Sequence, residues 1–175
     1  MKRGMRLLDL GCGYGEDSLY FARKGMRVTA MDFSKTGTRH LQKEAQRLDY
    51  DMDVRCNDLS KKLPFKNNSF DAVYAHLSLH YFDDHKTQKI FEEVKRILKP
   101  GGVFFVKCKS VDDPLFGKGK KVGVDMYHHD HARRFFRKEF MQSLLNDWTI
   151  VSVRRTSSTY VDYRSNFIEA VARKA

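Results

Sequence analysis

The sequence predicts one α/β domain built on a mostly parallel sheet, and three observations predict it. Strand-like and helix-like segments alternate along the chain, which is typical of parallel α/β proteins. The 175 residues suit one domain with one hydrophobic core. The chain carries no internal repeat and no low-complexity tract, so residues 1–175 are expected to form a single unit.

The first half of the chain supplies three predicted strands and two predicted helices. The strands cover residues 5–10, 27–31 and 52–56, and the first helix covers 16–24. Gly25 is placed to end this helix, since glycine tolerates the left-handed backbone found there. Ser34 suits the N-cap of the second helix, whose apolar face carries Leu41, Ala45 and Leu48.

The second half continues the alternation after a turn-rich loop at 61–70. Its predicted strands cover 71–75, 102–110, 148–155 and 166–174, and its predicted helices cover 85–98 and 137–146. Residues 111–131 show no periodicity, and a loop of this length is usually functional or mobile. Residues 156–165 are too few for a crossover helix, so the last two strands are expected to be antiparallel. Seven strands result, six parallel and one reversed.

The composition indicates which partners to expect. The net charge is +11, but lysines and arginines are scattered, with modest clusters at 118–121 and 133–138, so a well-solvated surface is favoured over nucleic-acid binding. The sequence has no apolar run near the roughly 20 residues of a membrane span and no signal-peptide pattern. Cys12, Cys56 and Cys108 are widely spaced, which favours a reducing, cytoplasmic compartment over a disulfide framework.

A glycine-rich turn follows the first predicted strand in "LLDLGCGYGED", with glycines at Gly11, Gly13 and Gly15. Glycine allows a positive φ and lets a ligand approach the backbone closely, and open α/β sheets bind ligands at the carboxyl ends of their strands. The dinucleotide pattern is GxGxxG. Here the third glycine comes one residue early and Glu16 takes its place, so the spacing argues against a dinucleotide.

Three acids follow the ends of three predicted strands: Asp9, Asp32 and Asp58. Asp9 would repel a pyrophosphate but suits a cationic group, Asp32 could accept both hydroxyls of a ribose, and Asp58 could accept from the exocyclic amine of adenine. The ligand implied is an adenosine with a positively charged tail, as in S-adenosylmethionine. Each acid also has a structural alternative, because Asp9 could fix the turn, Asp32 could cap the next helix, and Asp58 could form an Asx-turn with Ser60.

At these residues the sequence resembles the class I S-adenosylmethionine-dependent methyltransferases. Four stretches carry the resemblance, in the family's order and spacing: "LLDLGCGYG", "VTAMDFS", "NDLSKKLPFKNNSFDAVYAHLSLHYF" and "ILKPGGVFFV". The resemblance covers nearly the whole chain. It implies a Rossmann-like sheet of seven strands in the order 3-2-1-4-5-7-6, with strand 7 antiparallel and helices on both faces.

The resemblance also implies the cofactor, S-adenosyl-L-methionine, with S-adenosyl-L-homocysteine as the product. The residues expected to contact it are Asp9, Gly11, Cys12, Gly13, Gly15, Asp32, Phe33, Asp58, Leu59 and Ala75. The glycines would line the methionine part and Asp32 would hold the ribose. Asp58 and the Leu59 backbone would meet the adenine, with Phe33 packed against the adenine face.

The segment "AHLSLHYF" holds the candidate catalytic residues, His76, His80 and Tyr81. A sulfonium already activates its methyl group, so the protein must mainly align a nucleophile and exclude water. A general base is needed only if the acceptor's pKa demands one. In the family this segment lies between donor and acceptor, which makes His76 the first candidate. The alternative is that His80 and Tyr81 simply pack the start of a helix.

The stretch "YHHDH" at 127–131 holds His128, His129 and His131. Adjacent residues rarely point at one metal ion, so no metal is expected and a substrate loop is the better hypothesis. The resemblance supports this, because family members insert acceptor-side segments here. "DPLFGKGKK" and "HARRFFRKEF" resemble tellurite-resistance-type small-molecule methyltransferases. Arg133 and Arg134 could contact an anionic acceptor, or they could be surface charges.

The function predicted is methyl transfer to a small-molecule acceptor by in-line displacement. An RNA-modifying methyltransferase, a cofactor-binding protein without catalysis and a nicotinamide oxidoreductase stay as alternatives. The Asn/Asp-Pro-Pro-Tyr and Pro-Cys motifs of two nucleic-acid subclasses are absent from the sequence. Many family members carry tens of residues before the first strand. Here only residues 1–4 precede it, so N-terminal lid helices are expected to be missing.

Overall fold

The computed structural model describes residues 2–160 and 163–175. Its main sheet has seven strands in the spatial order β3 (Asp53–Cys56), β2 (Arg27–Asp32), β1 (Arg6–Leu10), β4 (Phe70–His76), β5 (Leu98–Lys109), β10 (Tyr163–Arg173) and β9 (Thr149–Tyr160). The first five strands pair in parallel, while β10 runs antiparallel to both β5 and β9. The predicted strand order and the reversed last strand are confirmed.

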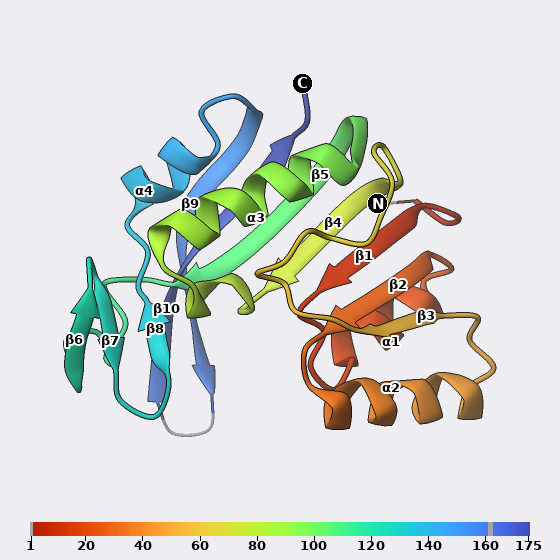
Figure 1. Cartoon of the computed structure of the whole chain (residues 1–175), viewed down its shortest axis with the longest axis horizontal. Coiled ribbons are helices and arrows are strands. Elements are labelled where there is room, and N and C mark those ends of the chain that lie inside the picture. The colour runs from red at the N-terminus through yellow and green to blue at the C-terminus, as the bar shows by residue number, and fades with distance from the viewer. Residues whose placement is uncertain (1, 161–162) are drawn as a thin grey trace.

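In the described part of the chain, four α-helices pack on this sheet: α1 (Glu16–Arg23), α2 (Lys35–Arg47), α3 (Asp84–Ile97) and α4 (Lys138–Leu144). Figure 1 shows α3 and α4 in front of the sheet and α1 behind it. A 3-10 turn, η1 (Leu79–Tyr81), links β4 to α3. Ser34 caps α2 as expected, since its hydroxyl accepts the Gly37 N–H at 3.1 Å.

Alternate residues of each strand point to opposite faces, which creates two cores. On the face of α3 and α4, Leu8 and Val73 join the larger apolar cluster together with Val94. On the face of α1, Leu7 and Ala72 pack with Phe21 of that helix. Farther along the same face, the ring of Tyr74 stacks on that of Phe105 with centroids 4.8 Å apart. Tyr74, near the end of β4, thus lies on the α1 face of the sheet.

The predicted loop at 111–131 is partly wrong, because the segment contributes to a second sheet. Its three antiparallel strands are β6 (Lys120–Gly123), β7 (Met126–His128) and β8 (Ala132–Arg134). They have only three or four residues, and every residue of β6 is exposed. Such short strands bury too little to show a hydrophobic alternation. This inserted sheet (β6–β8) lies at one end of the molecule (Figure 1).

The loop expected at 156–165 is also wrong in its described part. Strands β9 and β10 continue as a long hairpin, in which Thr156 pairs with Phe167 and Thr159 with Arg164. Residues 161–162 of the expected loop lie outside the described part. The extension was missed because its paired residues are largely polar, as in "TSST", so apolar patterning gave no sign of a strand.

Candidate active site

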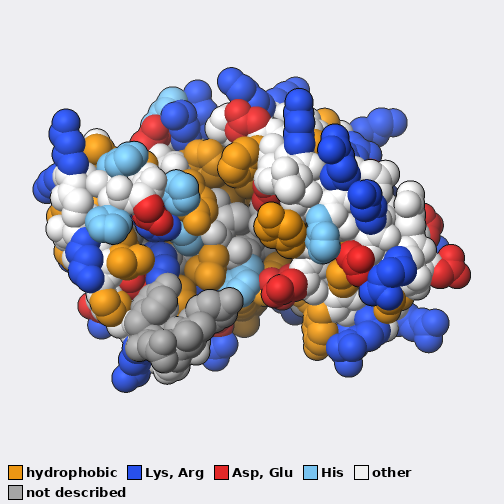
Figure 2. All heavy atoms as spheres, turned by 90° about the horizontal axis from the view of Figure 1, so that it is seen from below, with side chains coloured by type: hydrophobic (Ala, Val, Ile, Leu, Met, Phe, Trp, Pro, Cys, Tyr) orange, Lys and Arg blue, Asp and Glu red, His pale blue; other side chains and the backbone are white. Residues whose placement is uncertain are grey.

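The carboxyl ends of the parallel strands meet at one edge of the main sheet, where the glycine turn follows β1. Figure 2 shows the molecule from this side, with a hollow between two lobes and histidine and hydrophobic side chains gathered around it. Ligands of open α/β sheets bind at such an edge. The candidate residues are therefore described outward from the glycine turn.

All three glycines of the turn adopt a positive φ, with values of 87° at Gly11, 55° at Gly13 and 88° at Gly15. A Cβ on Gly11 would overlap Ser78, and a Cβ on Gly15 would overlap Leu41. A Cβ on Gly13 would meet nothing within 4 Å. The outer two glycines thus let the chain pack closely, whereas Gly13 faces open space in which a ligand could lie.

Asp32 braces the glycine turn from the end of β2. Its carboxylate is buried and accepts the Gly13 N–H at 2.9 Å and the Ser34 N–H at 2.8 Å. A carboxylate has about four acceptor positions, so each oxygen keeps one for a further donor. The arrangement fits a ribose whose two hydroxyls donate to Asp32, next to the open space at Gly13.

Asp9 lies deeper in the molecule, beneath the turn. Only 2% of the residue is exposed, and its Oδ2 accepts from the Ser18 hydroxyl at 2.5 Å. Burial raises the pKa of Asp9 to about 7, although the bond from Ser18 opposes the shift. Asp9 therefore links β1 to α1 through the Ser18 side chain. Its contact with a cationic ligand stays a prediction.

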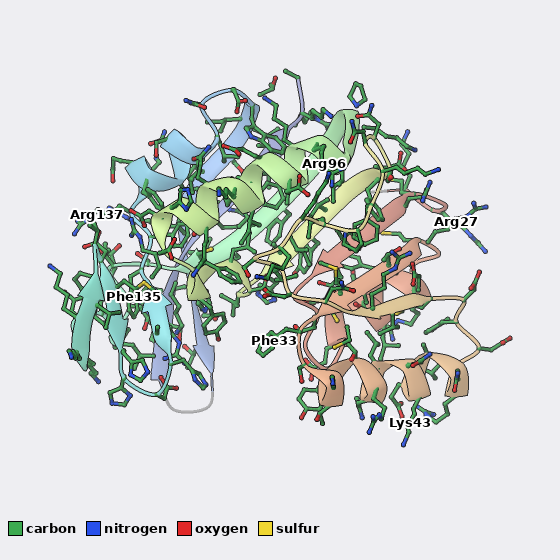
Figure 3. The ribbon with its side chains drawn as sticks, viewed as in Figure 1. Arg27, Phe33, Lys43, Arg96, Phe135 and Arg137 are labelled. Carbon is green, nitrogen blue, oxygen red and sulfur yellow. The ribbon has the colours of Figure 1, made fainter. Side chains whose placement is uncertain are left out.

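Asp58 and Phe33 flank the expected adenine position. Asp58 forms the Asx-turn, because its Oδ1 accepts from the Ser60 N–H at 2.8 Å and from the Ser60 hydroxyl at 2.7 Å. These bonds lower the pKa of Asp58. Phe33 is 75% exposed and points away from β2 into open space (Figure 3). An aromatic face so exposed beside the turn is suited to stacking on a base.

The remaining cofactor candidates are more enclosed. Leu59 is buried beside Asp58, and Ala75 has no exposed surface, so Ala75 could act only by supporting its neighbours. Cys12 is half-buried, and burial raises the pKa of its thiol. A thiol held in its neutral form is a poor nucleophile. Cys12 thus contributes backbone to the turn and no reactive group.

His76 ends β4 next to the glycine turn, and its Nδ1 lies 3.0 Å from Oδ2 of Asp17 in the first turn of α1. The bond to His76 lowers the pKa of Asp17, and the nearby Tyr74 side chain lowers it further. The sequence reasoning missed Asp17. One signal was available in the sequence: Asp17 is an acid two residues after Gly15, the last glycine of the turn. The turn and the end of β4 lie at the same edge of the sheet, so Asp17 comes close to His76.

His80 and Tyr81 differ from His76. His80 is 2% exposed, burial lowers its pKa to about 3, and its Nδ1 has no hydrogen-bond partner among the described residues. A ring so enclosed favours the alternative in which His80 packs the segment after β4. Tyr81 is 42% exposed, and the Arg133 guanidinium lies 5.9 Å from its ring centroid.

The inserted sheet is fixed to the domain by one of the two arginines considered for an anionic acceptor. Arg134 is 2% exposed and its Nε lies 2.7 Å from Oδ1 of Asp84 at the start of α3, so it cannot contact an acceptor and that option is wrong. Arg133 pairs with Asp130.

The three histidines of "YHHDH" are exposed. Within residues 2–160 and 163–175, no group of three or more histidine, cysteine or acidic side chains could hold a metal ion.

The part of the chain described contains no helix long and apolar enough to cross a membrane.

Residues 8–106 match the sequence model of the family described as "Methyltransferase domain". An uncharacterized methyltransferase of Synechocystis is 33% identical over 153 residues, covering 87% of this chain and 69% of that protein. Several other curated relatives are longer, and the chain spans between 24% and 54% of their length.

Two solved structures share the fold. A Methanosarcina mazei S-adenosylmethionine-dependent methyltransferase superposes with a TM-score of 0.83 at 21% identity, covering 99% of this chain and 94% of that one. A Burkholderia thailandensis N1-methyltransferase, bound to 1,6-didemethyltoxoflavin and S-adenosylhomocysteine, gives 0.79 at 24% identity, covering 99% and 72%. Together with the strand order and the glycine turn, these matches show that the chain belongs to the methyltransferase domain family and has the fold of S-adenosylmethionine-dependent methyltransferases.

Proposed function

We propose that the protein transfers a methyl group from S-adenosylmethionine to a small-molecule acceptor. The observation that carries the proposal is the glycine turn, which Asp32 braces while Gly13 leaves open space beside it. Two relatives are named for small acceptors: one is a demethylmenaquinone methyltransferase and the other a glycine/sarcosine/dimethylglycine N-methyltransferase. The hollowed edge next to the turn offers room for such an acceptor (Figure 2).

Four residues of the site would hold the cofactor. Asp32 would accept the two ribose hydroxyls, Phe33 would stack on the adenine, and Asp58 would accept from its amine. The open backbone at Gly13 would lie against the methionine part. When bound, S-adenosylmethionine supplies a methyl group that its sulfonium already makes electrophilic. The protein must then hold the acceptor in line and keep water away.

The compartment proposed is the cytoplasm. Cys12, Cys56 and Cys108 are all free thiols in the structure, and free thiols persist where glutathione and thioredoxin keep them reduced. Expression with a fluorescent tag, followed by fractionation, checks this assignment.

Calorimetry and an acceptor screen test the proposed function. We expect binding of S-adenosylmethionine and S-adenosylhomocysteine, no binding of NAD, and transfer of labelled methyl to at least one thiol, phenol, amine or carboxylate. Tight NAD binding without an adenosylmethionine signal would overturn the cofactor assignment. Transfer to RNA alone, lost at raised salt, would replace the small-molecule acceptor with a nucleic acid.

A further inference from the structure

His76 and Asp17 form a hydrogen-bonded pair. Neither residue takes part in the cofactor binding proposed above. They are 59 residues apart in sequence, and the bond joins Nδ1 of His76 to Oδ2 of Asp17 at 3.0 Å. Both side chains stay accessible, with 33% of the histidine and 42% of the aspartate exposed. A ligand can therefore reach both side chains, close to where the glycine turn ends at Gly15.

The bond fixes which imidazole nitrogen carries the proton. The histidine contact holds the pKa of Asp17 below its usual range, so the group is a carboxylate at neutral pH and can only accept. Nδ1 must then donate. In the neutral ring Nε2 keeps a free lone pair, which is the arrangement of a histidine base oriented by a carboxylate.

A cation lies beside this pair. Lys107 of β5 stands opposite His76 in the parallel ladder, and its Nζ is 4.5 Å from the ring centroid of Phe167. Its charge contributes to the low pKa of Asp17. No ion pair in the described part of the chain involves Lys107, so its ammonium is available to attract an acceptor that becomes an anion.

We infer that His76, oriented by Asp17, is the general base of the methyl transfer, and that the acceptor is a hydroxyl group, most simply a phenol, that is protonated at neutral pH. This inference rests on the proposed function. A lone pair of the acceptor oxygen forms the O–C bond while the C–S bond breaks and its electron pair stays on sulfur. The acceptor proton passes to Nε2 of His76, and Asp17 stabilises the imidazolium until the proton leaves to water.

Nuclear magnetic resonance tests the pair without turnover. Long-range ¹H–¹⁵N spectra are expected to show His76 protonated at Nδ1 in the wild type. In Asp17→Asn the amide can donate to Nδ1, and the ring is expected to change to the Nε2–H tautomer, as an Asp-to-Asn change does in a serine protease triad. The control Asp51→Asn, at an exposed acid, should leave the His76 signals in place. A wild-type ring protonated at Nε2 alone overturns the inference.

Kinetics then test the role of the base and the class of acceptor. The probes are two sets of similar phenols, one ionised and one protonated at the assay pH. His76→Gln is expected to lower kcat on the protonated phenols by about 10²- to 10⁴-fold, the usual contribution of general base catalysis, and to stay within about twofold on the ionised ones. His85→Gln, at an exposed histidine of α3, is the control and should change neither set.

The outcomes separate this inference from the proposed function. Equal losses on both phenol sets, or a fall in S-adenosylhomocysteine affinity as large as the fall in kcat, would place the pair in cofactor binding and overturn the inference. A wild type that methylates thiols or amines but neither phenol set overturns the acceptor class and leaves the proposed function intact. A wild type that methylates nothing in the whole screen contradicts the proposed function as well.

Discussion

The Asp32 side chain has two roles. Its carboxylate oxygens accept hydrogen bonds that hold the glycine turn, and the same oxygens are expected to bind the ribose hydroxyls. The Gly13 and Ser34 N–H groups both donate to it. We expect Asp32→Ala to weaken S-adenosylhomocysteine binding at least about 100-fold, since charge-assisted hydrogen bonds are lost and buried N–H groups are left unpaired. Asp53→Ala, at an exposed acid that pairs with Arg55, is the calorimetric control. Unchanged affinity in Asp32→Ala would contradict the ribose assignment.

Asp9 makes the stability of the protein depend on pH. Burial raises its pKa from 3.8 to about 7, so between these values the folded chain binds a proton that the unfolded chain has lost. Stability contributed by this group therefore falls as pH rises through that window, by at most about 1.4 kcal/mol per pH unit. Above pH 7 the contribution is constant.

Asp9→Asn removes this titration while keeping an acceptor for Ser18. Relative to the wild type, the variant is expected to gain stability between pH 5 and pH 8, measured by urea unfolding at both values. Asp51→Asn serves as the exposed control and should follow the wild type. If the difference in the free energy of unfolding between Asp9→Asn and the wild type does not change with pH, burial does not raise the pKa of Asp9.

At the scale of elements, the inserted sheet depends on one buried arginine. Arg134 of β8 pairs with Asp84 of α3 at 2.7 Å, and its Nη1 lies 3.7 Å from Asp125. The Asp84 side chain is 45% exposed, so loss of the buried Arg134 leaves no buried charge there; it removes a hydrogen bond between charged groups, which contributes about 1.5–3 kcal/mol. We expect Arg134→Ala to lower the free energy of unfolding by that amount in urea titrations.

Arg137 gives a matched control for this prediction. It binds the same Asp125, with its Nε 2.7 Å from Oδ2, but its side chain is 53% exposed. Figure 3 shows it at the outer surface of this end of the molecule. Exposed ion pairs are screened by water and salt, so Arg137→Ala should change unfolding little. If both variants lose equal stability, burial is not what makes Arg134 an anchor.

The elements also show where sequence reasoning succeeds and where it stops. The order of the main strands and the positions of Gly11, Gly13 and Gly15 follow from local patterns and from the resemblance, and the fold confirms the order. The strands of the inserted sheet leave little such pattern, since β6 is exposed along its whole length. The His76–Asp17 pair depends on β4 lying beside the start of α1, and the burial of His80 depends on packing around η1. Neither is a property of a local stretch.

At the scale of the whole molecule, the question is whether a charge of +11 forms a nucleic-acid surface or is simply spread over the protein. Lys120 and Lys121 of β6 are exposed, and so are Lys35 and Lys43 of α2 at the other end of the molecule. If the charge is spread, replacing either pair with glutamine should lower the salt dependence of single-stranded RNA binding equally, by about 1.4 in the slope of log K against log salt. Methyl transfer to the small acceptor should stay unchanged in both double variants. Fluorescence anisotropy with a labelled RNA over a salt series measures the slopes. A loss of RNA affinity confined to the Lys120 and Lys121 variant, accompanied by a loss of methyl transfer to RNA, would instead make the inserted sheet a nucleic-acid surface.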